Sequence, residues 1–172
     1  AGISSEITLK VWNKYKNKLD PFIYFGDPNH LLKTNRKLKY NVPIKVIKKI
    51  DDGFNLFNNF LPVYEIELNN NVNFGAPSIK NSKQVLISIN KVVKFAIKKK
   101  ISSVVTNPVD KNIIKKSEKK FNGHTFYIAK LLSIKNPVML LTSPRISVVP
   151  ITQHLSLKNA LKKVTTNRIV LT

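Results

Sequence analysis

The sequence contains no cysteine, few acidic residues and very little arginine. Without cysteine, disulfide bonds and thiolate metal sites are excluded, so any metal ion would be held by histidine, aspartate or glutamate. No apolar run approaches the roughly 20 residues that a membrane-spanning helix needs, and no signal-peptide pattern opens the chain. We therefore expect a cytoplasmic protein that has no membrane partner.

The shortage of acidic residues leaves a large excess of positive charge. There are 30 lysines and arginines against 9 acidic residues, a formal net charge of +21. A basic surface can bind nucleic acid because it releases counterions from phosphates. Only Arg36, Arg145 and Arg168 are arginine, however, and arginine is the residue that base recognition favours. We interpret the charge as a solvated lysine coat, with a basic nucleic-acid-binding module without catalysis as the alternative.

Segments typical of strands alternate with segments typical of helices, which predicts an α/β protein with a mixed sheet. Hydrophobic residues make up 42% of the 172 residues, enough for an ordinary domain with a core. Strands are expected at 22–25, 44–47, 63–68, 101–106, 138–142 and 146–152. Helices are expected at 2–14, 29–38, 82–100, 126–132 and 157–164, with polar loops at 51–59 and 69–77. Because the chain starts at Ala1 without methionine and ends in an apolar run without a capping signal, we expect truncation at both ends.

A polar cluster follows the apolar run that ends at residue 106. Asn107, Asp110 and Lys111 lie here, and strand ends are where α/β proteins place binding residues. Amide, carboxylate and ammonium groups in one loop suit phosphate or carboxylate binding. A turn that carries a solvated lysine explains them almost as well.

The three histidines lie in different contexts. His124, between Gly123 and Thr125, precedes a helix, so the three residues either bind an anion or cap that helix. His154 ends a strand and is either a ligand or a structural hydrogen-bonding residue. His30 lies in the first turn of an expected surface helix, and we interpret it as a surface residue without partners.

The order of these motifs resembles the 4-hydroxythreonine-4-phosphate dehydrogenase family of pyridoxal phosphate (vitamin B6) biosynthesis. The motifs are T-N-P-V-D-K at 106–111, G-H-T at 123–125 and V-P-I-T-Q-H-L-S-L at 149–157. Weaker matches support them, namely A-G-I at 1–3, G-D-P at 26–28 and L-P-V at 61–63. The resemblance extends over essentially the whole chain.

This resemblance implies a two-domain α/β/α fold similar to that of isopropylmalate dehydrogenases. Residues 1–172 would be the N-terminal portion of a larger homodimeric enzyme, with an internal domain boundary that the sequence does not locate. The implied cofactors are NAD or NADP and a divalent metal ion such as Zn, Mg or Co. The implied reaction is oxidation, with decarboxylation, of 4-phosphooxy-L-threonine (4-hydroxy-L-threonine phosphate). A paralogous dehydrogenase of threonate or erythronate phosphate is the alternative.

The resemblance also implies roles for individual residues. The substrate-binding residues would be His124, Thr125, Lys111, Asn107 and Asp110. His154 would be the first of three metal histidines, whose site lies at the dimer interface. The other two belong to a C-terminal half that this sequence does not contain, so we expect the chain alone to be inactive. We further expect His124 and His154 to open onto the same cleft.

Two motifs depart from the family pattern. The family opens with G-I-G-P-[DE], whereas this chain has Ser4 and Ser5 after Gly2-Ile3. Loss of that second glycine changes how closely a ligand could approach the backbone. Phe126 replaces the usual acidic residue after G-H-T, which makes this turn less polar. These departures indicate a divergent member.

Overall fold

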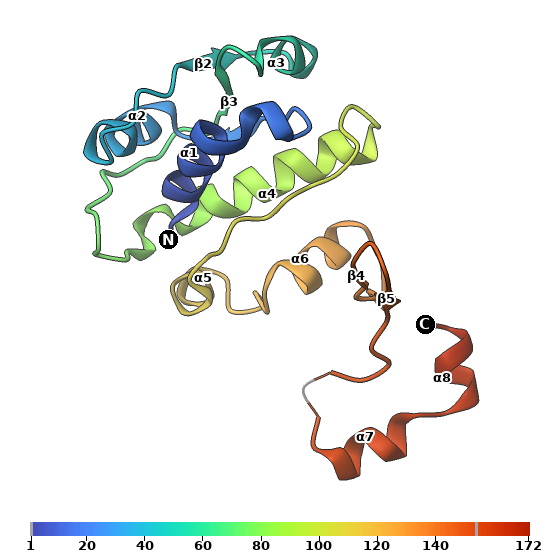
Figure 1. The fold of residues 1–172 in the computed structure, drawn as a ribbon. Helices are drawn as coiled ribbons and strands as arrows, with labels where there is room; N and C mark the ends of the chain where they lie inside the picture. Colours follow the sequence, from blue (N-terminus) through green and yellow to red (C-terminus); the bar gives the residue numbers. More distant parts are fainter. Residues whose placement is uncertain (1, 154) are drawn as a thin grey trace.

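The computed structural model describes residues 2–153 and 155–172. Its first part alternates strands and helices, namely α1 (Ser4–Tyr15), η1 (Lys16–Lys18), β1 (Tyr24–Gly26), α2 (Pro28–Lys37), β2 (Ile44–Ile47), α3 (Ile50–Leu56), β3 (Leu61–Glu65), η2 (Ile79–Asn81) and α4 (Ser82–Ile97). The second part consists of α5 (Lys111–Ser117), α6 (His124–Leu131), the strands β4 (Leu141–Thr142) and β5 (Ser147–Val148), α7 (Leu157–Lys163) and α8 (Thr166–Val170). Figure 1 shows this order along the chain.

Within these residues, β1, β3 and β2 form a parallel sheet with β3 at the centre. Tyr24 of β1 and Val46 of β2 both pair with Val63. The strands β4 and β5 pair antiparallel in a separate hairpin. The predicted α/β class is therefore confirmed, with parallel and antiparallel strands in different sheets.

Helices cover both faces of the parallel sheet. Successive side chains of a strand point to opposite faces, so Val63 belongs to the core formed with α1 and α2, together with Leu9, Trp12, Leu31, Val42, Phe57 and Leu61. On the other face, the rings of Phe25 and Tyr64 contact Phe95 of α4 at centroid distances of 6.0 and 5.4 Å. The result is an α/β/α arrangement around β1, β2 and β3.

Some sequence expectations are wrong. Residues 51–59 do not form a loop, because α3 occupies most of them. Residues 101–106 form no strand in the part of the chain that the structure describes, and Val105 is 90% exposed. An alternating or apolar run becomes a strand only where a neighbour pairs with it, and this segment has none.

Helix starts differ in how they are capped. Ile3 occupies the N-cap position of α1 and makes no side-chain cap hydrogen bond within the described residues. Ser156 precedes α7, but its side chain makes no cap hydrogen bond within the described residues. Near the C-terminus, the Thr165 hydroxyl accepts a hydrogen bond from the Arg168 N–H at 3.2 Å and so caps the start of α8.

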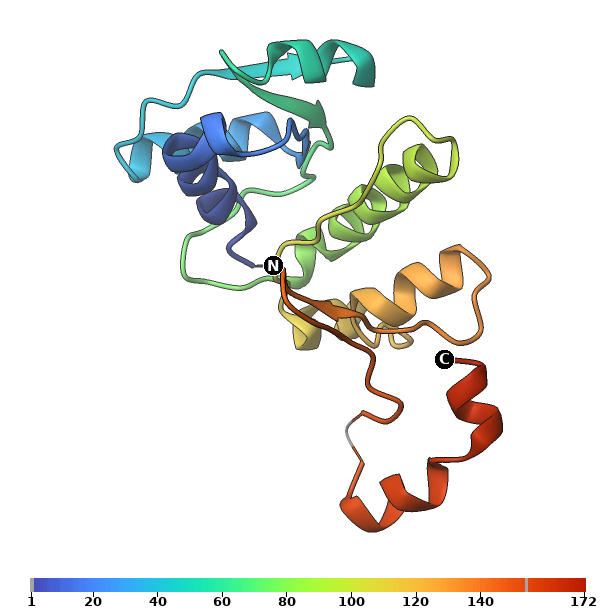
Figure 2. The ribbon, with the colours of Figure 1, turned by 45° about the vertical axis from the view of Figure 1, so that its right-hand side comes forward.

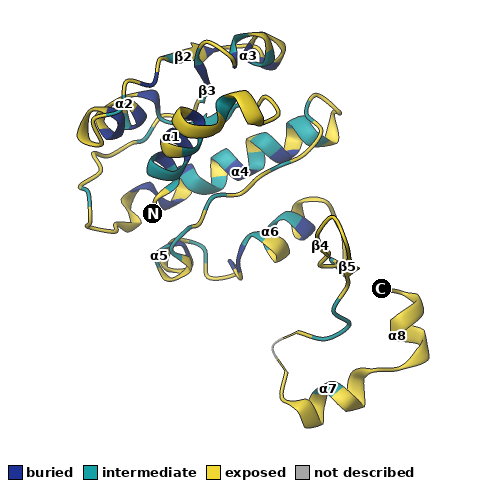
Figure 3. Ribbon diagram, viewed as in Figure 1, coloured by how far each residue is buried: buried dark blue, intermediate teal, exposed yellow. Residues whose placement is uncertain are grey.

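Burial is concentrated in the first part of the chain. Figure 3 shows the buried residues around the sheet, α4, α5 and α6, whereas the hairpin, α7 and α8 are largely exposed. None of the described residues after Ala129 is buried. Figures 1 and 2 both show α7 and α8 far from the parallel sheet. No helix in the described residues is long and apolar enough to span a membrane.

Candidate functional site

The G-H-T motif forms the start of α6. Gly123 is the N-cap residue with φ of +101°, a conformation that side chains other than glycine rarely adopt. His124 is the first helical residue, and within the described residues no side chain caps this helix. The N-terminus of α6 therefore presents backbone N–H groups and the positive end of the helix dipole.

Lys111 lies over this helix start. A Cβ atom added at Gly123 would be 3.4 Å from Cε and 3.5 Å from Nζ of Lys111. The structure thus brings together Lys111 and His124, which are 13 residues apart in the sequence. A lysine ammonium near a helix N-terminus is electrostatically unfavourable unless an anion is present, so this arrangement suits a negatively charged group.

The His124 imidazole is half-buried beside Phe121. Their ring centroids are 6.1 Å apart in an edge-to-face arrangement, and Phe121 is fully buried. Burial lowers the pKa of His124 below its usual value, and the positive charge of Lys111 lowers this pKa further. The neutral imidazole is therefore favoured, and one ring nitrogen can donate a hydrogen bond while the other accepts one.

Contacts with α4 hold α6 in place. The Tyr127 ring packs against Phe121 at 5.6 Å, and the Asn90 side-chain amide donates to the Tyr127 hydroxyl at 3.1 Å. Phe121 and Ala129 are buried in this region. These contacts with Phe121 and with Asn90 of α4 therefore hold the start of α6 in position.

The side chains of Asn107 and Asp110 are engaged elsewhere. Nδ2 of Asn107 donates to Oγ1 of Thr8 in α1 at 3.2 Å. Oδ1 of Asp110 accepts from the backbone N–H groups of Asn112 and Ile113 at 2.9 and 3.1 Å and so caps α5. These contacts position Lys111, the residue that follows Asp110, whereas a direct substrate contact by Asn107 or Asp110 stays a prediction.

The N-terminal glycine also supports this loop. Gly2 has φ of +141°, and a Cβ atom at this position would collide with the carbonyl oxygen of Pro108. A residue without a side chain therefore allows the chain start to lie against the loop that precedes Lys111. A long-range contact of this kind has no signal in the sequence beyond the glycine itself.

Thr125 is exposed and lines a hollow that includes neither Lys111 nor His124. This hollow, of about 410 Å³, lies between α6 and residues 132–138, and most of its lining is apolar, including Ile128 and Leu132. A phosphate in this mostly apolar hollow would accept few hydrogen bonds and would meet no positive charge. The predicted substrate contact of Thr125 stays a prediction.

The predicted metal ligand His154 lies outside the described residues. The expectation that His124 and His154 share a cleft is therefore untested. Among the residues that are described, no group of three or more histidine, aspartate and glutamate side chains is arranged to hold a metal ion. The metal site that the resemblance implies takes only His154 from this chain, so this absence among the described residues does not test it.

The interpretation of His30 as a surface residue without partners is wrong. Its ring is half-buried and stacks on Phe74 at 5.7 Å, and burial is the main cause that lowers its pKa. It also lines a hollow beside α2. The signal that was missed is the single aromatic residue, Phe74, in the polar stretch 69–77.

Comparison with known proteins agrees with the motif order. The family model described as pyridoxal phosphate biosynthetic protein PdxA matches residues 17–172. The chain belongs to this family. The PdxA match thus covers all three of the motifs at 106–111, 123–125 and 149–157.

Similar full-length proteins show how much of a PdxA protein this chain represents. A protein named 4-hydroxythreonine-4-phosphate dehydrogenase from Sulfurihydrogenibium sp. (strain YO3AOP1) is 29% identical over 99% of this chain and 52% of its own length. One of the same name from Methylorubrum populi is 32% identical over 92% of this chain and 47% of its own length. The chain therefore spans about half the length of the curated relatives it matches.

A solved structure supports the fold. The crystal structure of a 4-hydroxythreonine-4-phosphate dehydrogenase from Burkholderia phymatum superposes with a TM-score of 0.85 at 22% identity, covering 98% of this chain and 52% of that one. The predicted similarity to a dehydrogenase fold of this type is confirmed.

Proposed function

We propose that this chain forms the N-terminal portion of a two-domain 4-hydroxythreonine-4-phosphate dehydrogenase. The proposed reaction is the NAD(P)- and divalent-metal-dependent oxidation, with decarboxylation, of 4-phosphooxy-L-threonine. Membership of the PdxA family supports this proposal, as do relatives that carry the enzyme's name. The proposed setting is a cytoplasmic homodimer.

The observation that carries the proposal is the placement of Lys111 over the start of α6, beside His124. The ammonium group, the N–H groups at the start of the helix and the imidazole can all donate hydrogen bonds, and Lys111 lies close to both Gly123 and His124. A phosphate monoester has three acceptor oxygens and two negative charges, so it satisfies these donors and offsets the charge of Lys111. We therefore assign the phosphorylated end of the substrate to this location.

His154 remains the proposed single metal ligand of this chain. One imidazole without further protein ligands binds a divalent ion weakly, because water must fill the other positions. We therefore expect no turnover by the 172-residue chain.

The test separates binding from turnover. NMR of the 172-residue chain, with 4-phosphooxy-L-threonine as ligand, should show saturable shifts of the His124 ring and the 123–126 amides. Lys111→Gln should weaken binding about tenfold or more, since a hydrogen bond to a charged group contributes about 1.5–3 kcal/mol. Lys115→Gln, at an exposed position on the same helix, is the matched control and should retain wild-type affinity.

Three results would contradict the proposal. The first is an absence of saturable shifts around His124. The second is an equal loss of affinity in both lysine variants, which would indicate general attraction to a basic chain. The third is NAD(P)H formation by the 172-residue chain above that of a His154→Ala control. Erythronate 4-phosphate, tested in parallel, distinguishes the paralogous substrate by its relative affinity.

A further inference from the structure

A second hollow, of about 460 Å³, lies between α2 and residues 67–72. These residues follow β3, and α2 follows β1, so the hollow opens at the carboxyl ends of two parallel strands. In open parallel sheets this is the edge at which ligands bind, and the volume lies in the range of small-molecule sites. Figure 1 shows α2 well separated from α5 and α6, so this hollow is distinct from the candidate site.

Hydrogen bonds hold the two walls of the hollow together. The Asp27 carboxylate accepts from the His30 N–H at 2.7 Å with Oδ1 and from the Leu68 N–H at 2.8 Å with Oδ2, which links α2 to the opposite wall. The buried Asn81 side chain accepts from the Asn70 N–H at 3.1 Å and donates to the Asn70 carbonyl at 2.7 Å. The segment after β3 is therefore held in a defined conformation.

Phe74, which follows residues 67–72, also contacts α2. Phe74 lies between two side chains of α2, since its ring stacks on His30 at 5.7 Å and Nζ of Lys37 lies 3.9 Å from the ring centroid. The chain that follows the hollow is therefore also packed against α2. The hollow is thus bounded at several points and does not depend on a single flexible loop.

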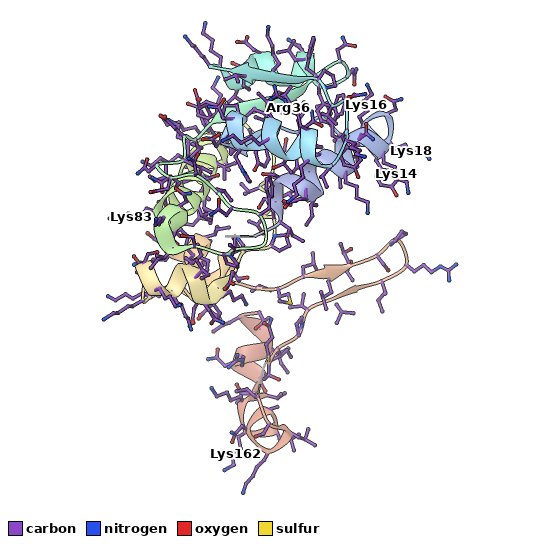
Figure 4. The ribbon with its side chains drawn as sticks, turned by 90° about the vertical axis from the view of Figure 1, so that its left-hand side faces the viewer. Lys14, Lys16, Lys18, Arg36, Lys83 and Lys162 are labelled. Atoms are coloured by element: carbon purple, nitrogen blue, oxygen red, sulfur yellow. The ribbon has the colours of Figure 1, made fainter. Side chains whose placement is uncertain are left out.

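The helix wall is cationic. Lys33 and Arg36 are three residues apart on α2, which places them on neighbouring positions of one helix face, and both line the hollow. In Figure 4, the side of the molecule that carries α2 faces the viewer, and Arg36 is labelled on this helix. Neither Lys33 nor Arg36 forms a salt bridge within the described residues, so both cations are available to an anion. An arginine with a lysine suits a phosphate group.

The facing wall is polar and rich in hydrogen-bonding groups. Glu67, Asn69 and Asn71 line it, and all three residues are exposed. Carboxylate and amide oxygens accept hydrogen bonds from hydroxyl groups. This wall therefore suits the hydroxylated part of a ligand whose charged end contacts α2.

We propose that this hollow is a binding site for a small phosphorylated polyhydroxy metabolite, with its phosphate on Lys33 and Arg36 and its hydroxyl groups on Glu67 and the asparagines. The site is separate from the Lys111 and His124 location and does not depend on the function proposed for it. Half-buried His30 adds a neutral hydrogen-bonding group at the edge, because burial disfavours its charged form.

The experiment is an NMR titration of the ¹⁵N-labelled 172-residue chain at physiological ionic strength, with glycerol 3-phosphate, inorganic phosphate and glycerol as probes. We expect glycerol 3-phosphate to give saturable shifts in residues 29–36 and 67–72. Inorganic phosphate should bind at the same place more weakly, and glycerol should not bind measurably. Glu67→Gln should reduce the advantage of glycerol 3-phosphate over inorganic phosphate.

Two double variants with the same change in net charge supply the control. Lys33→Gln with Arg36→Gln should weaken binding about tenfold or more. Lys14→Gln with Lys18→Gln, on exposed residues of α1 and η1 that do not line the hollow, should leave the affinity unchanged. Spectra that are unchanged away from the substitutions check that both variants fold.

An equal loss in the two double variants, or shifts spread over all lysine-rich surfaces, would overturn the proposal, because general charge attraction would then explain binding. Shifts confined to the start of α6 would also overturn it. Equal affinity for glycerol 3-phosphate and inorganic phosphate would overturn the role of the Glu67 wall.

Discussion

Residues 2–129 and residues 130–172 contain many large apolar side chains but use them differently. In the first region, side chains such as Leu9, Phe57 and Val63 are almost completely buried around a parallel sheet. In the second, Leu157, Leu161 and Val170 are between 69% and 78% exposed. Apolar periodicity therefore predicts which side chains favour burial, but a core forms only where another element faces them.

The same contrast applies to polar contacts. The first region has long-range links, for example the Trp12 indole N–H, which donates to the Phe57 carbonyl at 3.2 Å across 45 positions. In the second region, the Arg168 guanidinium donates to the Ile151 carbonyl at 3.0 Å, and this group is exposed. The stability of the chain is therefore expected to come almost entirely from the first region.

The largest expected effect follows from removal of a buried ring in the first region. Phe57 is 1% exposed and packs edge-to-face on both Trp12 and Phe22. Phe57→Ala should lower the free energy of unfolding by about 3–5 kcal/mol, because it leaves a cavity in the core. Leu157→Ala in the second region should change it by no more than about 0.5 kcal/mol.

Urea unfolding monitored by Trp12 fluorescence measures both variants. Comparable losses for Phe57→Ala and Leu157→Ala would mean that the second region packs as well as the first, contrary to the exposure that the structure shows. A Leu161→Ala variant, at another exposed position of α7, checks that Leu157 is representative of that helix.

A smaller effect is expected at the contact that joins the chain start to the candidate site. Gly2 and Gly75 both have positive φ, but an added Cβ would collide with Pro108 only at Gly2 and would meet nothing within 4 Å at Gly75. Gly75→Ala should therefore cost about 1–2 kcal/mol for the backbone conformation alone. Gly2→Ala should also release the chain start from the loop before Lys111.

Hydrogen exchange distinguishes these two outcomes. In Gly2→Ala, we expect faster exchange in residues 107–114 than in the wild type, whereas Gly75→Ala should leave this segment protected. Unchanged exchange in Gly2→Ala would show that the contact with Pro108 does not support the loop.

The local pattern of apolar and polar residues correctly predicted elements such as β2 and α4. The strand Ile44–Ile47 has the predicted bounds, and α4 follows from apolar residues at helical spacing. By contrast, α3 contains Gly53, and glycine is a poor helix former. It forms because the missing side chain of Gly53 lets the helix pack on Ile23 and Ile47, where a Cβ would lie only 2.7 Å from both side chains. Such tertiary contacts cannot be read from a local pattern.

The candidate site shows the same division. The motifs placed Lys111 and His124 in one site through resemblance, and the structure brings them together at α6. The hydrogen bond of Asn107 to Thr8 joins residues 99 positions apart, and no local rule predicts this partner. His30 was misinterpreted for the same reason, since its partner Phe74 lies in a distant loop.

The two regions also differ in how their helix starts are capped. Asp110 caps α5 through two hydrogen bonds, whereas Ser156, at the same position before α7, makes none with the described backbone. Asp110→Ala should lower the free energy of unfolding by about 1 kcal/mol, the usual contribution of such a cap. Ser156→Ala should be close to neutral. Urea unfolding measures both, and equal effects would contradict the difference between these two helix starts.

The smallest expected effect concerns the charge of His124. Burial is the main cause of its lowered pKa, and Lys111 is the second. Lys111→Gln should therefore raise the pKa of His124 while leaving it below the usual value, because burial remains. Lys130→Gln, at the last turn of α6, is the control and should leave this pKa almost unchanged. A ring-proton NMR titration measures all three proteins.

This lowered pKa also fixes the sign of a pH effect on stability. The folded chain disfavours the imidazolium, so the unfolded chain binds more protons once the pH falls below about 6.5, the ordinary pKa of histidine. The stability associated with neutral His124 is present above this pH and is lost as the pH falls through the lowered pKa. His30 contributes in the same direction, so only the difference between wild type and Lys111→Gln isolates His124. A loss of stability on acidification that is steeper in Lys111→Gln than in the wild type would contradict the position of Lys111 beside the imidazole, because without that positive charge the protonated ring is easier to accommodate.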